Sequence, residues 1–171
     1  MVRQAMAGLR VLLALTLLTG VAYPLAVLGV GRVAFSRQAD GSLVKHDGRV
    51  VGSRLLAQPF DGPQWFHPRV IGGPSNLGPN EPALLALVAE RRAALGDGAP
   101  ADALTGSGSG ADPHITPANA AFQAPRVAAA RHLPLGTVLA LIAAHTERRT
   151  LGILGEDRVN VLMLNLALDA G

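Results

Sequence analysis

Cysteine is absent from the 171-residue chain, which excludes disulfide bonds and thiolate-bound metals but does not select a cellular compartment. Aromatic residues make up only 4% of the sequence, so a hydrophobic core has to be built mainly from Leu, Val and Ala. Such a thin core would gain stability from a partner surface. The formal charge is +3, but the arginines are scattered and no run of five basic residues occurs, so nucleic-acid binding is not indicated.

Charge is also missing from residues 11–31, and Arg10 and Arg32 stand at the two ends of this run. A helix of this length extends about 31 Å, which matches a bilayer core of roughly 30 Å. The hydrophobic region of a cleaved signal peptide is shorter, about 7–15 residues, and ends at a site of the A-x-A kind. This run is longer and contains no such site. The sequence therefore predicts a transmembrane helix at residues 11–31.

Two residues in the middle of this helix are unusual in lipid. Pro24 removes one backbone donor and predicts a kink, and the hydroxyl of Tyr23 needs a polar partner. Both are easier to accommodate against protein than against lipid. The basic residues on the two sides of the helix nearly balance, so they leave the orientation open.

The remainder of the chain alternates strand, loop and helix signals. Asp47-Gly48 lies between two short apolar stretches and predicts a type I′ hairpin at residues 42–53. Long loops are expected at residues 61–82 and 98–112. The other expected elements are a helix capped by Asn80 and ended by Gly96, a helix from Thr116 to Arg131 kinked at Pro125, a helix at 135–146, a short strand at 151–154 and a buried helix at 159–168. The fold class is α+β, a single N-terminal transmembrane helix followed by one small mixed domain.

The glycine-rich residues 106–111 formally fit G-x-G-x-x-A, but the following prolines delay any helix, so a structural loop is favoured over a nucleotide site. Ser107 or Ser109 with Asp112 and His114 would supply the residue types of a hydrolase. The five histidines show no HxxxH or HExxH spacing, which argues against a metal site.

Several sequence blocks, in this order, resemble one family: the C subunit of the Kdp high-affinity potassium-transporting P-type ATPase. These blocks are residues 19–24 (TGVAYP), 52–53 (GS), 58–60 (QPF), 65–69 (WFHPR), 75–80 (SNLGPN), 105–117 (TGSGSGADPHITP), 123–127 (QAPRV) with 130–131 (AR), and 159–169 (VNVLMLNLALD). Residues 70–74 are shorter than the usual family insert at this place, and Ala111 replaces a usual Leu.

The resemblance implies a non-catalytic, single-span subunit of a complex in the bacterial cytoplasmic (inner) membrane. Its partners would be a channel-like potassium-binding subunit, a P-type ATP-hydrolysing subunit and a small single-span subunit, besides membrane lipid. It would have no cofactor of its own, because ATP and potassium are bound by the partner subunits. Its family role is that of a catalytic chaperone that raises the ATP affinity of the hydrolysing subunit. Family topology gives a cytoplasmic tail at residues 1–10 and an extracytoplasmic domain at residues 32–171.

The resemblance and the chemistry of the residues together select two sets of candidates. Residues expected to fix assembly are Tyr23, Pro24, Gln123, Arg126 and Arg131, and residues of the family-motif loops are Ser75, Asn76, Ser107, Ser109, Asp112, Asn160 and Asn165. No catalytic, cofactor-binding or metal-binding residue is assigned. Two other functions stay open: a membrane-anchored extracytoplasmic hydrolase using Ser107 or Ser109 with His114, and a general envelope adaptor domain.

Overall fold

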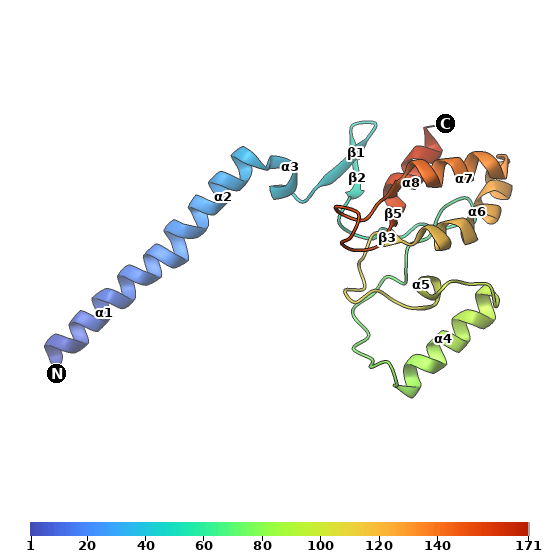
Figure 1. The fold of residues 1–171 in the computed structure, drawn as a ribbon. Coiled ribbons are helices and arrows are strands. Elements are labelled where there is room, and N and C mark those ends of the chain that lie inside the picture. Colours follow the sequence, from blue (N-terminus) through green and yellow to red (C-terminus); the bar gives the residue numbers. More distant parts are fainter. Residues whose placement is uncertain (171) are drawn as a thin grey trace. The chain divides into compact units, whose positions relative to one another are not determined.

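The computed structural model describes residues 1–170, and the chain divides into two compact units, Met1–Leu43 and a second unit that begins at Val44 (Figure 1). The first unit is a helical run from Val2 to Ala34, followed by the short α3 (Ser36–Ala39). None of the residues in this run is buried in the chain, and its most apolar window has a mean hydropathy of 2.2. By length and composition this run can cross a membrane.

Within this helical run, the turn before Pro24 has π-helical rather than α-helical hydrogen bonds. α1 (Val2–Leu17) and α2 (Tyr23–Ala34) are joined by a π-helical turn at Leu18–Ala22. The N–H of Tyr23 donates to the carbonyl of Leu18, five residues earlier. Pro24 then lies in the first turn of α2, where a missing donor costs little. A π-helical turn is thus how the helix accommodates this proline.

The second unit contains the expected hairpin and a second, small sheet. β1 (Leu43–His46) and β2 (Arg49–Ser53) are joined by Asp47 and Gly48, whose φ angles of 49° and 76° confirm the type I′ turn. The second sheet was not predicted, and its strands β3 (His114–Ile115), β4 (Thr146–Glu147) and β5 (Arg158–Asn160) are only two or three residues long. Its order is β3-β5-β4 with both pairs antiparallel, and Val159 is opposite Ile115 and Thr146.

Three helices pack together beside this sheet (Figure 1), and their buried residues supply most of the core. They are α6 (Pro117–Arg131), α7 (Leu135–Ala144) and α8 (Val161–Asp169), close to the predicted bounds. Thr116 caps α6 as expected, because its hydroxyl accepts a hydrogen bond from the N–H of Asn119 at 3.1 Å. The core cluster consists of Phe66, Ile115, Ala120, Ala124, Val127, Ala128, Val138, Ile142, Val159, Val161, Leu164 and Leu168.

Three local predictions differ from the structure. Helix α4 (Pro82–Leu95) begins one residue later than expected, with Glu81 and not Asn80 at its N-cap position, and no side chain caps it. α5 (Ala101–Leu104) is a single helical turn inside the predicted loop at 98–112. Residues 150–154 form a tight turn rather than a strand, because Leu151 and Gly152 both have positive φ angles.

Candidate assembly site: a clamped segment on α6 and α8

Residues 63–67, here called the clamped segment, are held by side chains of α6 and α8. The backbone of Phe66 exchanges two hydrogen bonds with the amide of Asn165, N–H to Oδ1 and Nδ2 to carbonyl, both at 2.9 Å. The backbone of His67 makes the same pair with Gln123, at 2.8 Å and 3.0 Å. Each side-chain amide thus binds both the N–H and the carbonyl of one residue, as the backbone of a neighbouring strand would. The benzyl group of Phe66, with no exposed surface, anchors the segment in the core.

A polar chain continues from Gln123 towards the start of α6. Gln123 Nε2 also donates to Asn119 Oδ1 at 3.0 Å, and Asn119 Nδ2 donates to Asp102 Oδ2 at 3.1 Å. Asp102 further accepts from the N–H of Thr116 at 2.8 Å and from its hydroxyl at 3.1 Å. This carboxylate of α5 therefore ties α5 to the N-terminus of α6, where a negative charge is favourable. No sequence signal distinguished Asp102.

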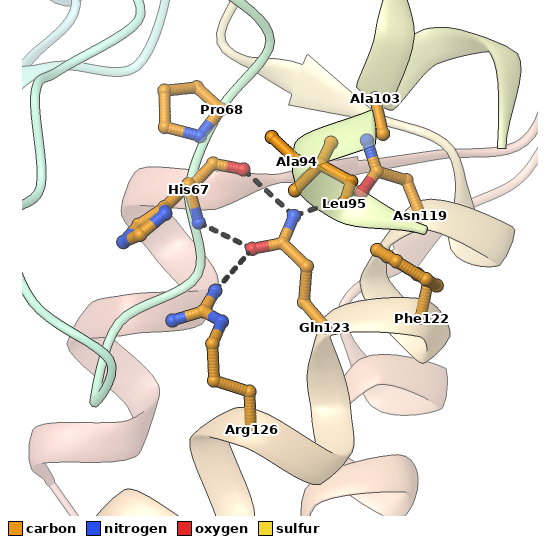
Figure 2. A pocket seen from close by; sticks show the side chains of 9 residues that line it. All are labelled: His67, Pro68, Ala94, Leu95, Ala103, Asn119, Phe122, Gln123 and Arg126. Atoms are coloured by element: carbon orange, nitrogen blue, oxygen red, sulfur yellow. Dashed lines mark hydrogen bonds between the residues drawn. The ribbon is translucent and has the colours of Figure 1, made fainter. Parts of the chain in front are cut away.

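Arg126 closes one end of the clamp. Its Nη2 donates to Gln123 Oε1 and its Nη1 to the carbonyl of Pro63, both at 2.8 Å. Burial lowers the pKa of this guanidinium from its ordinary value. Arg126 also borders a pocket of about 390 Å³ (Figure 2). The lining residues shown there come from α4, α5, α6, the last residue of the clamped segment and the proline after it: His67, Pro68, Ala94, Leu95, Ala103, Asn119, Phe122, Gln123 and Arg126.

Arg131 holds the clamped segment at Gln64, the residue after Pro63. Its guanidinium donates to the carbonyl of Gln64 at 2.8 Å and to the Asp169 carboxylate at 3.0 Å. It also lies over the ring of Trp65, with Cζ 4.3 Å from the centroid, in cation–π contact. Both arginines selected from the sequence thus bind main-chain carbonyls of the same segment. Their direct contact with another subunit stays a prediction.

The other motif residues build local structure in the second unit. Asn160 caps α8 by accepting from the N–H of Met163 and donates to the carbonyl of Arg54, at 3.2 Å and 2.9 Å. Ser75 Oγ accepts from the N–H of Leu77 at 3.4 Å, and Asn76 has a positive φ of 55°. These two residues shape the chain before α4.

Gly110 lies where the glycine-rich loop meets the short segment at residues 70–74. The N–H of Gly72 donates to the carbonyl of Gly110 at 3.0 Å. A Cβ at Gly110 would lie 1.8 Å from the carbonyl oxygen of Gly72, and its φ of +67° also disfavours a side chain. The shortened segment therefore packs backbone to backbone against this loop.

The residue types of a hydrolase line one open groove of about 590 Å³. His114 Nδ1 is 3.0 Å from Asp112 Oδ1, which resembles the base–acid pair of a catalytic triad. The oxygens of Ser107 and Ser109, however, accept backbone N–H groups, from Asp112 at 3.4 Å and Ala111 at 3.2 Å. Within residues 1–170, no hydrogen bond joins either serine to His114, and no group of His, Asp and Glu could hold a metal ion.

Tyr23 and Pro24 lie in the first unit, on the helical run that can span a membrane. The Tyr23 side chain is exposed in the chain alone, so its hydroxyl is available to a partner. The structure therefore divides the candidate assembly residues between the two units, and the role of each in assembly stays a prediction.

Comparison with known proteins decides the family. The model of the KdpC family, described as "K+-transporting ATPase, c chain", matches residues 5–170. The chain belongs to the KdpC family. This confirms the resemblance, and the match includes both structural units.

Relatives named "Potassium-transporting ATPase KdpC subunit" are similar over nearly their whole length. One from Cereibacter sphaeroides is 54% identical, with 93% of this chain and 92% of the relative covered. One from Rhodospirillum rubrum is 50% identical, with 99% and 96% covered, and one from Mycobacterium tuberculosis is 48% identical, with 98% of each covered. The alignment with the R. rubrum protein has 186 positions, more than the 171 residues of this chain, so that relative has residues that this chain lacks.

Proposed function

We propose that this chain is a non-catalytic membrane subunit of a high-affinity, ATP-driven potassium uptake complex in the bacterial cytoplasmic membrane. The observation that carries the proposal is the match of the family model to residues 5–170. In this complex the chain assembles with a channel-like potassium-binding subunit, an ATP-hydrolysing P-type subunit and a small single-span subunit. ATP and potassium are bound by those partners, and the chain has no cofactor of its own.

The role proposed for the chain is to stabilise the assembly and to raise the ATP affinity of the hydrolysing subunit. With a cytoplasmic N-terminus, the second unit lies outside the cytoplasm and does not touch cytosolic ATP. It then acts through a conformational equilibrium: a subunit that binds the ATP-competent state more tightly raises the population of that state. The clamped segment supports this role, because its bonds to Gln123, Arg126, Arg131 and Asn165 present a defined surface rather than a mobile loop.

The proposal is tested by reconstituting the potassium-stimulated ATPase with and without this chain. Without the chain, we expect the KM for ATP to rise and the complex to lose subunits in detergent, and adding the purified chain back should restore both. An intact complex with an unchanged KM for ATP would exclude this role. A general envelope adaptor would also leave potassium-dependent ATP turnover unchanged.

The proposed orientation is tested by single-cysteine labelling, which the absence of native cysteine makes clean. In intact cells an impermeant thiol reagent should label Ser42→Cys and should not label Gln4→Cys. The opposite pattern would reverse the topology and place the second unit in the cytoplasm.

The Asp112–His114 pair favours one second candidate, a hydrolase with Ser107 or Ser109 as nucleophile. Such an enzyme would retain esterase activity as the purified chain, and the activity would disappear in Ser107→Ala, Ser109→Ala and His114→Ala variants. For a non-catalytic subunit, we expect no activity above background and only a loosened loop in the triple variant.

A further inference from the structure

The turn between β4 and β5 carries the most exposed aliphatic cluster of the second unit. Leu151, Ile153 and Leu154, here called the apolar tip, are 85%, 76% and 58% exposed. Exposed apolar clusters of this kind mark interaction sites when they are held in one place. Neither the clamped segment nor the glycine-rich groove includes these residues.

The apolar tip belongs to an ordered turn. Thr150 and Leu154 exchange two backbone hydrogen bonds, at 2.9 Å and 3.0 Å, and the N–H of Gly152 donates to the carbonyl of Arg149 at 3.1 Å. Leu151 has a φ of +56°, a strained conformation for a leucine. The turn thus keeps a leucine exposed and strained where glycine or asparagine would fit better.

The base of the turn is fixed by charged residues of both signs. Glu147 pairs with Arg54 at 2.6 Å and with Arg158 at 3.1 Å. Asp157 accepts from the backbone N–H of Arg149 at 3.1 Å and lies 3.9 Å from the guanidinium of Arg148. An apolar centre within a polar, charged rim is the usual anatomy of a protein–protein interface.

The local charges favour a protein over lipid as the occupant. At the turn and its base, the four arginines Arg54, Arg148, Arg149 and Arg158 face the three carboxylates of Glu147, Glu156 and Asp157. The excess of a single positive charge is far below the basic clusters that attract anionic headgroups. It also lacks the Trp and Tyr residues that anchor loops at membrane interfaces, since the single Trp is Trp65 and the single Tyr is Tyr23.

We propose that the apolar tip docks into an apolar socket, bordered by charges of both signs, on another subunit of the same ATPase complex. This inference rests on the proposed function, because it needs that complex to exist. The aliphatic side chains fill the socket, and the arginines and carboxylates at the base of the turn pair with the charged border. A rigid tip loses little conformational entropy on binding, which favours affinity.

The first test substitutes the tip in the full chain and measures copurification with the three co-expressed subunits. Leu151→Asn with Ile153→Asn removes the aliphatic groups, and asparagine tolerates the positive φ of residue 151. We expect at least a tenfold loss of copurified subunits. The matched control is Leu85→Asn with Leu135→Asn, two exposed leucines of α4 and α7, which should copurify like the unsubstituted chain.

Unchanged copurification of the tip variant would overturn the inference and leave the proposed function standing. Failure of the unsubstituted chain to copurify would instead contradict the proposed function. An unaltered thermal midpoint, read from Trp65 fluorescence, shows that the tip variant is folded.

The second test asks what covers the tip. A fluorophore on Ile153→Cys is quenched by iodide in the full chain alone, in nanodiscs of zwitterionic and anionic phospholipid, and in the assembled complex. We expect quenching to fall at least fivefold only in the complex. Protection in nanodiscs without partners would identify lipid as the occupant, and protection that grows with chain concentration would identify a second copy. Either result would overturn the proposal.

Discussion

Helices α4 and α6 have similar lengths, and their burial is the reverse of what their composition suggests. α4 is rich in leucine, yet none of its residues is buried, and Leu85 is 62% exposed. α6 consists mainly of Ala with Asn, Gln and Arg, yet six of its residues are buried, including Asn119 and Gln123. The difference arises because small alanines let the sheet and α7 approach closely, while polar side chains bind the clamped segment. Burial here follows close packing and hydrogen bonding, and not the number of leucines.

The strongest test of this contrast removes the side chain that joins α6 to the clamped segment. Phe66→Ala should lower the free energy of unfolding by about 3–5 kcal/mol, because it leaves a cavity in the core. Leu85→Ala on α4 should change it by about 0.5 kcal/mol or less. Denaturant titration of the full chain in detergent, followed by Trp65 fluorescence, measures both. Equal effects would show that α4 is as well packed as α6.

The predicted part of the fold is the part that local signals specify. Asp47-Gly48 determines the hairpin turn, and Thr116-Pro117 determines the start of α6. The strands of the small sheet are too short for an alternating pattern, and they form only because distant segments meet. The same holds for the clamp: the resemblance singled out Gln123 and Asn165, but their partners lie 56 and 99 residues away in the sequence. A backbone partner so distant in the sequence cannot be predicted from the residues around Gln123 or from those around Asn165.

A glycine substitution tests whether the glycine-rich loop at residues 106–111 is packed as tightly as the clamped segment. Gly110→Ala places a Cβ against the carbonyl of Gly72 at a positive φ. We therefore expect the free energy of unfolding to fall by about 1–3 kcal/mol or more. Gly98→Ala is the control, because a Cβ there meets nothing within 4 Å. Thermal denaturation of the two full-chain variants compares them. Similar midpoints would mean that residues 70–74 move away easily.

Substitution of Arg126 distinguishes a role of this side chain in the fold from a role in assembly. If it also contacts a partner subunit, Arg126→Ala should weaken the complex by about 2–5 kcal/mol, because truncation leaves buried polar groups unpaired. The subunit should then be released from the detergent-solubilised complex while the chain alone still melts cooperatively. An intact complex would show that Arg126 is no interface anchor. Unfolding of the chain alone would show that its bonds to Gln123 and Pro63 serve the fold.

The smallest effect is expected at the surface ion pairs of Glu147, at the base of the apolar tip. Burial alone would raise the pKa of this carboxyl, but hydrogen bonds and charge from Arg54 and Arg158 outweigh it and lower the pKa. A carboxyl with a lowered pKa in the folded state stabilises the fold above the ordinary pKa of glutamate, about 4.3, and loses this contribution as the pH falls through the lowered value.

Because both arginines are nearly half exposed, the contribution is about 0.5 kcal/mol, well below that of the buried clamp. Glu147→Gln should therefore be less stable than the unsubstituted chain at pH 7 by this amount, and the gap should close in acid, where the carboxyl is protonated. Glu156→Gln, on the exposed side of the same turn, is the control. Denaturant titrations at several pH values measure the gap. A gap that persists at low pH would mean that Glu147 acts by packing and not by charge.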